Sequence, residues 1–205
     1  MEGERIQELR ISTELQVSRG SVREALLLLQ RTQLIEIYPR RGAIVSEMST
    51  QQVRALFDTS ALLLGQIVQR MAEVWRAHEA DNIQQLLNQL HDETRQGHTE
   101  KFYDLIFQGL ARQHDLISNS YLMKFYHDLL PALRRSYFLT LNISRRELDE
   151  SFALFKLVTD AILNRKAQQA TLFMDDFCRH LRNLVLESLT RMKQIELAWA
   201  RRSRR

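Results

Sequence analysis

The stretch that decides the fold is Val17-Ser-Arg-Gly-Ser-Val-Arg-Glu-Ala-Leu26, followed by Leu34-Ile-Glu-Ile-Tyr38 and Ala43-Ile-Val-Ser46. Ser18 is a favourable N-cap, and apolar residues then recur at helical spacing, so the first segment predicts a helix over residues 18–30. The other two segments alternate like short strands, and Pro39-Arg-Arg-Gly42 between them is a turn. A helix followed by a small hairpin is therefore expected.

The residues before this stretch extend the pattern. Ile6, Leu9, Ile11 and Leu15 recur at roughly helical spacing, and Gln16-Val17 indicates a short turn before the next helix. Two helices followed by a hairpin form the pattern of a winged helix-turn-helix. We expect residues 1–48 to form one such domain.

The remainder of the chain, residues 49–205, is predicted to be helical almost throughout. Ser49 can cap a long helix that ends near Trp75. Further amphipathic stretches cover residues 79–96, 100–117, 120–140, 145–164 and 167–199. Because the connections between them are short, the helices are expected to form an antiparallel bundle. The fold class is therefore mainly α, with a basic tail at Arg201-Arg-Ser-Arg-Arg205.

The composition agrees with a helical chain and excludes several classes. The 205 residues include only 6 Gly and 2 Pro, fewer than a chain of strands and tight turns needs. A single cysteine, Cys178, indicates a reducing setting, so a cytoplasmic location is expected. No apolar run is long enough for a membrane span, and the N-terminus is too polar for a signal peptide. The net charge of +4 permits nucleic acid as a partner without requiring it.

Two motifs in the sequence are similar to known families. The string from Val17 to Leu26, with Arg41-Gly42 in the later turn, resembles the GntR family of bacterial regulators, whose pattern is roughly V-S-R-x-x-V-R-E-A-L and then R-G-x-x-V. The helical remainder resembles the ligand-binding FCD domain of the FadR subfamily. Its pattern D-x-x-F-H and N-x-x-L is matched by Asp104-x-x-Phe107 and Asn119-x-x-Leu122.

The resemblance implies a bacterial transcription regulator. Such a protein binds a near-palindromic DNA operator as a homodimer, and a small organic effector changes its affinity for that operator; repression relieved by ligand is the commoner mode. Family members usually have a further segment before the residues that begin here, which forms the first helix of the DNA-binding domain. We therefore expect this domain to lack its first helix, and a helical interaction protein that has lost DNA binding is the alternative.

The resemblance also implies which residues contact DNA. The helix over residues 18–30 would lie in the major groove, where arginine can contact phosphates or donate twice to guanine. Serine hydroxyls and the helix N-terminus suit phosphate oxygens, and a glycine permits close approach. The candidates are Arg10, Ser18, Arg19, Gly20, Ser21 and Arg23, with Arg40, Arg41 and Gly42 in the wing. The alternative is that these arginines form a solvated helix face, and for Arg23 a further alternative is an ion pair with Glu24 within the domain.

Many FCD domains bind a divalent ion through one aspartate and three histidines. At the corresponding positions this chain has Asp104, Gln108, Phe155 and Phe177. Phenylalanine has no atom that can bind a metal, so we predict no metal and no cofactor. His180 lies one turn beyond Phe177, which leaves a shifted ligand set as the alternative.

The helical domain is expected to hold an effector cavity between its helices. The candidate lining residues are Asp104, Gln108, Arg135, Tyr137, Phe155, Phe177 and His180. Because two histidine positions have become phenylalanine, we expect an organic, partly apolar effector. The polar members of this set could instead be surface or capping residues, and the cavity could be collapsed.

Enzyme function is not predicted. The sequence has no H-E-x-x-H, E-x-x-H, G-x-G-x-x-G or P-loop motif. The remaining histidines show no metal-binding spacing: His78, His91, His98, His114 and His127. Cys178 lies in an apolar helical stretch and is expected to be packed rather than nucleophilic.

Overall fold

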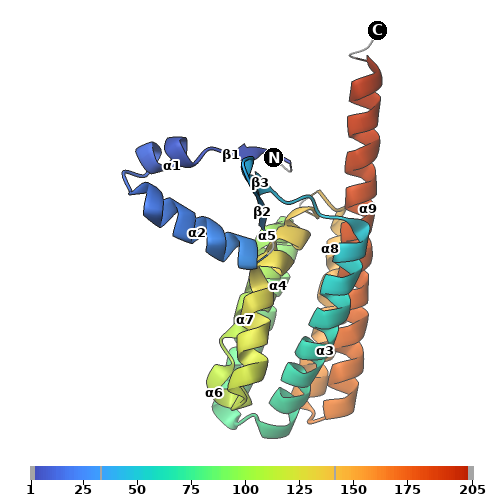
Figure 1. Ribbon diagram of the computed structural model, residues 1–205. Coiled ribbons are helices and arrows are strands. Elements are labelled where there is room, and N and C mark those ends of the chain that lie inside the picture. Colours follow the sequence, from blue (N-terminus) through green and yellow to red (C-terminus); the bar gives the residue numbers. More distant parts are fainter. Residues whose placement is uncertain (1–2, 33, 141, 203–205) are drawn as a thin grey trace. The chain divides into compact units, whose positions relative to one another are not determined.

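The structure, a computed structural model, describes residues 3–32, 34–140 and 142–202. Within these ranges the side chains of residues 77, 78, 114, 115 and 196–202 are not described, so His78, His114 and the predicted basic tail lie outside the described side chains. The chain divides into two compact units, Met1–Ser49 and Thr50–Arg205. The residues of each unit pack mainly against other residues of the same unit (Figure 1).

The first unit contains a three-stranded antiparallel sheet and two helices. In chain order these are β1 (Arg5–Ile6), α1 (Glu8–Glu14), α2 (Arg19–Arg31), β2 (Ile35–Tyr38) and β3 (Gly42–Val45). The sheet order is β1-β3-β2, with Ile37 opposite Ala43 in the hairpin and Ile6 opposite Ala43 on the other side. The predicted winged helix-turn-helix is confirmed.

The start of this unit differs from the prediction. Ile6 was expected to begin a helix, but it lies in β1, and the helix begins at Glu8. The strand forms because β3 offers a free edge: the Val45 amide donates to the Glu4 carbonyl at 2.9 Å, and the Gly3 amide donates to the Val45 carbonyl at 3.0 Å. Pairing between distant segments decides such a short strand, and residue spacing does not reveal it.

The core of the first unit is small. It consists of Val22, Leu26, Ile35 and Ala43, with partly buried neighbours such as Ile11. Helix α1 has no buried residue among its seven. Several large apolar side chains of α1, α2 and the turn between them are exposed: Leu9, Leu15, Val17, Leu27, Leu28 and Leu29. A unit with so little buried apolar surface is expected to have low intrinsic stability.

The second unit consists of helices. They are α3 (Thr50–Val74), α4 (Ala77–Gln96), α5 (Thr99–Ala111), α6 (His114–Ile117), α7 (Ser120–Phe138), α8 (Arg145–Leu163) and α9 (Ala167–Arg202). The predicted helix over residues 100–117 is wrong in one respect, since it is interrupted between Ala111 and His114. Within the described residues, no helix has the length and apolar character that crossing a membrane requires.

The breaks between helices confirm the predicted ones and are marked by unusual backbone angles. Gly97 ends α4 at φ 74°, in the left-handed region, and Ser118 (φ 51°) and Arg165 (φ 56°) lie at two further breaks. The side chain of Arg165 donates to the carbonyls of Glu73 and Trp75 at 3.1 and 2.9 Å. It thereby caps the end of α3 with a residue from the α8–α9 connection.

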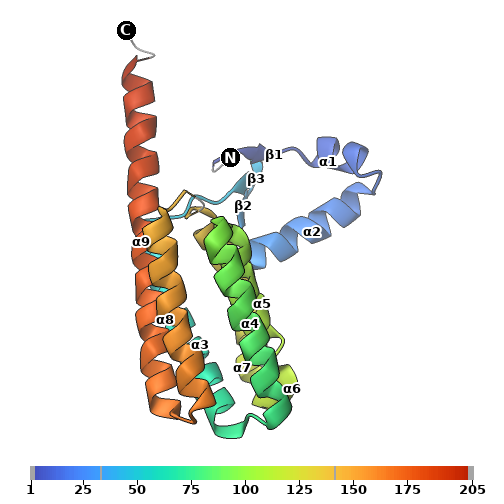
Figure 2. The same ribbon diagram turned by 180° about the vertical axis from the view of Figure 1, so that it is seen from behind.

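The long helices pack around a ring in the order α3, α9, α8, α4, α5 and α7, which returns to α3 (Figure 2). The most extensive pairing is between α3 and α9, which run antiparallel. It includes a close approach at Gly65, whose carbonyl accepts from the Thr171 hydroxyl at 3.2 Å. An ion pair between Arg182 and Asp58 at 2.7 Å lies further along the same pair of helices.

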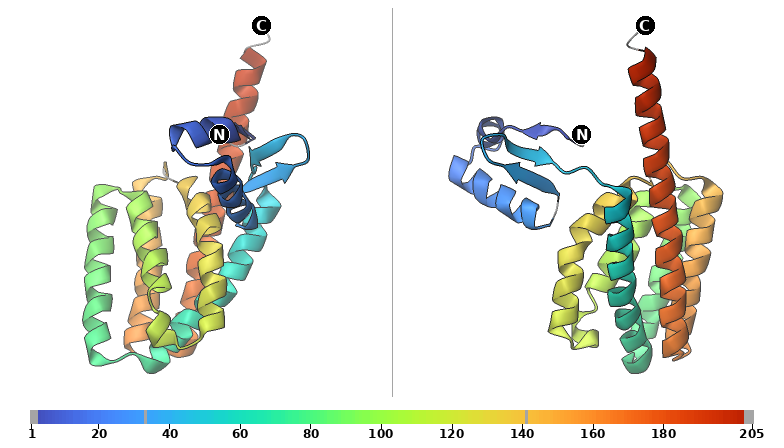
Figure 3. Two further views of the ribbon diagram at one scale, coloured as in Figure 1. Left: turned by 60° about the vertical axis from the view of Figure 1, so that its left-hand side comes forward. Right: turned by 45° about the vertical axis from the view of Figure 1, so that its right-hand side comes forward.

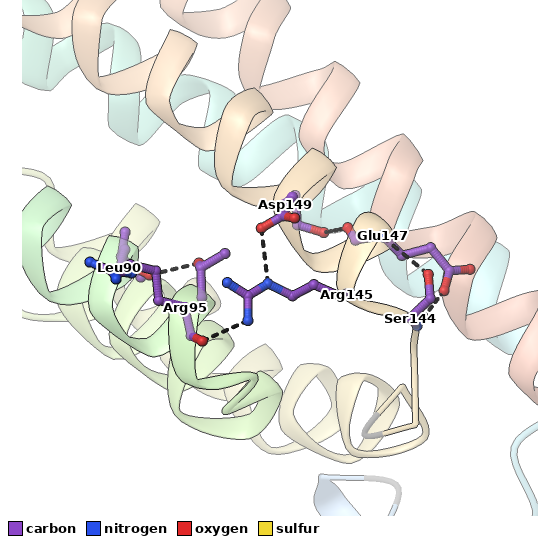
Figure 4. Close-up of polar contacts among 8 residues, drawn as sticks. Leu90, Arg95, Ser144, Arg145, Glu147 and Asp149 are labelled. Atoms are coloured by element: carbon purple, nitrogen blue, oxygen red, sulfur yellow. Dashed lines mark hydrogen bonds and ion pairs between the residues drawn. The ribbon is translucent and has the colours of Figure 1, made fainter.

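Polar contacts of Ser144 and Arg145 fix the start of α8 (Figure 4). Ser144 caps the helix, and Glu147 accepts from the Ser144 backbone amide at 2.6 Å, which completes a capping box. Arg145 donates to the carbonyl of Arg95 at 2.6 Å and forms an ion pair with Asp149. The Arg145–Arg95 hydrogen bond connects the first turn of α8 to the last turn of α4.

Candidate functional site

The N-terminal turn of α2 presents the predicted DNA-contacting residues on an exposed surface. The hydroxyl oxygen of Ser18 accepts from the Ser21 amide at 3.0 Å, so the predicted N-cap is confirmed. The side chains of Arg19 and Ser21 are exposed, and so is Gly20. Since the first amides of a helix have no partner within it, this turn presents N–H donors, hydroxyl groups and an arginine together.

The arginines near this turn have different partners. Arg23 forms an ion pair with Glu8 of α1 at 3.0 Å, not with Glu24 as the alternative supposed. Arg10 pairs with Glu14 at 2.7 Å. Arg19 has no ion pair with any described residue. Exposed pairs of this kind contribute little stability, so a phosphate could replace the carboxylate at small cost.

The wing is a tight hairpin with two arginines at its tip. Pro39 occupies the second position of the turn and Arg40 the third, with φ 63°, as a type II turn requires. Gly42 begins β3 at φ 80°, a left-handed backbone conformation that glycine adopts most readily. Both Arg40 and Arg41 are exposed.

The structure places a further arginine, Arg5, beside the wing arginines Arg40 and Arg41, and the sequence did not indicate it. A Cβ placed on Gly42 would lie 3.8 Å from Nε of Arg5, so the guanidinium group lies beside the wing. Arg5 reaches this position because β1 pairs with β3. Only that pairing, which is not readable from residue spacing, could have identified it.

Side chains from four helices fill the centre of the ring in the second unit. Tyr103, Phe107, Tyr137, Phe155 and Phe177 are each at most 2% exposed, and together they form what we call the aromatic centre. The rings of Phe107 and Tyr137 stack with centroids 5.4 Å apart, and Phe155 meets Phe177 edge to face at 5.4 Å. Two of the predicted effector residues therefore contact each other directly.

Asp104 and Tyr137, both predicted effector residues, are joined at the edge of this centre. The Tyr137 hydroxyl donates to one carboxylate oxygen of Asp104, and Arg134 donates to the other at 3.1 Å. Burial, together with this carboxylate, raises the pKa of Tyr137 well above its ordinary value. Asp104 thus already has partners on both oxygens.

The residues at the four family metal positions do not fit a divalent ion. Phe155 and Phe177 offer no donor atom, and Asp104 is held by Tyr137 and Arg134. Among the described residues, no three His, Cys, Asp or Glu side chains gather in a way that could hold a metal. The hydrogen-bonded pair of Asp104 and Tyr137 lies where the family pattern has its metal ligands.

His180, the candidate for a shifted ligand set, has a different partner. Its Nε2 lies 3.0 Å from the Ser151 hydroxyl, which also lies 3.0 Å from the Tyr103 hydroxyl. The Ser151 hydroxyl also lies 2.9 Å from the Glu147 carbonyl, to which it can donate. Nε2 of His180 therefore faces a serine hydroxyl.

The remaining predicted residues are less closely gathered. Gln108 and Arg135 are half-buried. Cys178 is buried, and burial raises its pKa to about 12, so the prediction that it is packed is confirmed.

An apolar cavity of about 70 Å³ lies beside the aromatic centre, and Phe155 forms part of its wall. It is bounded by α3, α4, α5, α6 and α8. Its main apolar lining residues are Val68, Met71, Ile83, Leu86, Leu110 and Ile162. Of the predicted effector residues, Phe155 borders this cavity.

Comparison with known proteins accounts for both units. The sequence pattern named "Bacterial regulatory proteins, gntR family" matches residues 1–45, and that of the FCD domain matches residues 55–183. The chain belongs to the GntR family, in the branch that carries an FCD domain. The predicted family is thereby confirmed.

Relatives of this GntR-family chain are distant in sequence. It is 23% identical over 144 residues to the gluconate operon transcriptional repressor of Bacillus subtilis (strain 168), an alignment that covers 69% of this chain and 58% of that protein. Its fold is similar to E. coli McbR/YncC, with a TM-score of 0.78, 17% identity and 92% and 89% of the two chains covered. A putative GntR regulator from Rhodococcus sp. RHA1 has a TM-score of 0.73 at 15% identity, with 91% and 88% covered.

Proposed function

We propose that this chain is a ligand-responsive transcriptional repressor that binds a near-palindromic operator as a homodimer. The observation that carries the proposal is the exposed first turn of α2, where Arg19, Gly20 and Ser21 stand together on a helix N-terminus. Arginine side chains on such a turn can reach guanine edges in the major groove. The tip of the wing, with Arg40 and Arg41, supplies further contacts to phosphates or the minor groove.

In this proposal the first unit binds DNA and the second unit binds the effector. Two copies of the first unit, brought together by dimerisation, would read two half-sites of the operator. An effector in the second unit would favour one arrangement of the DNA-binding units over the other. It changes occupancy of the operator only to the extent that it binds the two arrangements with different affinity.

The second unit favours a neutral, partly apolar organic effector. The aromatic centre consists of uncharged side chains, and the acid at its edge, Asp104, is already paired with Tyr137 and Arg134. The neighbouring cavity has an apolar wall that includes Phe155. We propose that the effector enters there and acts on the predicted residues Gln108, Arg135, Phe177 and His180 through the packing of α5, α7 and α9.

Gly20 provides a test that separates folding from DNA binding. A Cβ at this position would lie 3.5 Å from the Ser18 hydroxyl oxygen, an ordinary contact, so the fold tolerates alanine there. In Gly20→Ala we expect unchanged or slightly higher stability, because alanine favours helix, and at least tenfold weaker binding to a selected operator. The operator would first be selected from a random duplex library with the wild-type chain.

Arg19→Ala supplies the second arm of this test. We expect it to lose much of the preference for the selected operator over random duplex, since one good arginine–base contact discriminates by roughly 1–3 kcal/mol. The matched control is Arg31→Ala, which removes an exposed arginine at the other end of α2. If the library yields no enriched sequence, the alternative of a helical interaction protein without DNA binding is favoured.

A further inference from the structure

Helix α7 presents two large aromatic side chains to solvent. Tyr121 is 75% exposed and Phe125 is 56% exposed, and the two residues lie one helical turn apart on the same face. Figure 3 shows α7 (yellow) on the outside of the second unit, beside α3 (teal), against which it packs. Large aromatic side chains are enriched in protein interfaces, so their exposure together on one helix face indicates an interaction surface.

Two opposite charges on the outer side of α7 have no partner within the chain. Lys124 and Asp128 are exposed and lie one turn apart, yet their side chains form no ion pair or hydrogen bond with any described residue. On α8, a lysine and an aspartate at the same spacing and in the same order do pair, since Lys156 lies 2.6 Å from Asp160. Lys124 and Asp128 are therefore available to charges outside their own helix.

We propose that this face of α7 is the surface on which two copies of the chain pair, with their two α7 helices antiparallel. The inference rests on the proposed function, in which the protein acts as a homodimer, and it names the surface that holds the dimer together. A two-fold symmetric interface has the same patch on both sides, so the patch must be complementary to itself. A helix face that carries a lysine and an aspartate one turn apart meets this requirement.

The two charges also determine the register of the pairing. When the two-fold axis passes midway between Lys124 and Asp128, each lysine lies opposite the aspartate of the second copy, and two ion pairs form at the centre. The same register places Tyr121 of each copy at the level of Ala132 of the other, where a small side chain leaves room for the aromatic ring. Phe125 lies close to the axis, near its counterpart in the second copy. The exposed aromatic side chains are thereby covered in both copies.

Other exposed apolar positions of the second unit are less suited to a second copy. Leu157 on α8 is exposed, but the neighbouring lysine and aspartate are already paired with each other. Leu172 on α9 is followed one turn later by Asp176, which pairs with Arg179 at 3.4 Å. A second copy approaching either place would find charges that already have partners, so it would gain no complementary contact there.

The test reverses the two charges separately and together in the full chain. Lys124→Asp leaves only acids on this part of the face and Asp128→Lys leaves only lysines, so like charges meet across the axis in each single variant. Dimerisation is measured by sedimentation equilibrium at about 0.05 M salt, where screening is weak. We expect a dimer for the wild-type chain and at least roughly tenfold weaker dimerisation for each single variant, because like charges in contact across an interface are costly.

Two further samples distinguish a specific contact from a general loss of structure. The double variant Lys124→Asp/Asp128→Lys again places opposite charges across the axis, so it should dimerise nearly as well as the wild-type chain. An equal mixture of the two single variants should form heterodimers, because one contributes acids and the other contributes lysines at the same place. Phe125→Ser should also weaken dimerisation by roughly tenfold, since a central aromatic side chain often dominates an interface. Circular dichroism verifies that each variant is folded.

The matched control makes the same reversals on α8, with Lys156→Asp and Asp160→Lys, and these should leave dimerisation unchanged. Single α7 variants that dimerise like the wild-type chain would overturn the proposal and place the dimer contact on another surface. A wild-type chain that stays monomeric would overturn it as well, as would a double variant that fails to recover. The selection of an operator tests the proposed function separately: its failure leaves the sedimentation result standing, and unchanged sedimentation of the variants leaves operator binding standing.

Discussion

The hydroxyl group of Tyr137 on α7 donates a hydrogen bond to the carboxylate of Asp104 on α5, at the edge of the aromatic centre. Asp104 is the one family ligand position that keeps a metal-binding residue type, and here its carboxylate faces a phenol and Arg134. The same site in this chain is therefore built as a packed structural centre.

Removing the Tyr137 hydroxyl should destabilise the second unit. In Tyr137→Phe the half-buried Asp104 keeps Arg134 as its partner but loses the phenol, and we expect the free energy of unfolding to fall by about 1–2 kcal/mol. Urea denaturation followed by circular dichroism measures the change. Tyr121→Phe, at a position 75% exposed, is the control and should be neutral.

Divalent ions should not bind at the Asp104 site. We expect the wild-type chain, dialysed against Mn²⁺, Ni²⁺ or Zn²⁺ and then against buffer, to retain no stoichiometric metal by elemental analysis, since Phe155 and Phe177 supply no ligand. Retention of one ion per chain that is abolished in Asp104→Asn would contradict this. Retention unaffected by Asp104→Asn would place the ion elsewhere.

The close approach of α3 and α9 should depend on Gly65. A Cβ there would lie 3.1 Å from Cγ2 of Thr171, so Gly65→Ala should destabilise the fold by about 1–3 kcal/mol. Adding Thr171→Ser removes that methyl and keeps the hydroxyl that donates to the Gly65 carbonyl, so the double variant should recover most of the loss. Gly109→Ala is the matched control, because its Cβ would meet Leu86 at an ordinary 3.7 Å. Failure of Thr171→Ser to rescue would show that the contact does not limit the packing.

Acid should weaken the start of α8 through Glu147. Hydrogen bonds from Ser144 lower the pKa of Glu147 below its ordinary value of 4.5, and Arg191 and His180 lower it further. A depressed pKa stabilises the fold above pH 4.5, and this contribution is lost as the pH falls through the lower, folded-state value. Glu147→Gln should therefore be less stable by about 0.5–1 kcal/mol at pH 7 and converge with wild type in strong acid.

The control for this prediction is Glu150→Gln, which breaks an exposed ion pair with Arg146 on the same helix. Such a pair contributes little, so the stability of this variant should follow wild type across the pH range. A constant difference between Glu147→Gln and wild type from pH 7 to pH 3 would show that the carboxylate charge is not what stabilises the cap.

Local features of the sequence predicted much of the fold. Ser18 and Ser144 mark helix starts because their side chains bond to backbone amides three residues on, and Asn119 does the same by accepting from Leu122 at 3.0 Å. Asn119-x-x-Leu122, noted as a family pattern, is thus a helix cap. Gly97 marks an end because it adopts a left-handed conformation that other residues avoid.

Features that depend on distant segments were not predictable in the same way. Strand β1 forms because it pairs with the edge of β3, and this pairing is what brings Arg5 to the wing. The aromatic centre likewise gathers side chains from four helices, so the contact of Phe155 with Phe177 could be anticipated only from the family pattern. Asp104 and Tyr137 were each predicted to line the cavity, but the hydrogen bond between them was not predicted, since the two residues lie 33 positions apart in the sequence.

The central claim, operator recognition by the first unit, is tested most directly by the affinity of the wild-type chain for the DNA upstream of its own gene. Fluorescence anisotropy would compare that fragment with a shuffled duplex of equal length and composition at 0.15 M salt. The account predicts a preference of roughly a thousandfold or more for the upstream fragment, as is typical of specific over non-specific binding, and expects Arg19→Ala and Arg23→Ala to reduce it strongly. Equal affinity for the two duplexes, repeated with an operator selected from a random library, would contradict it.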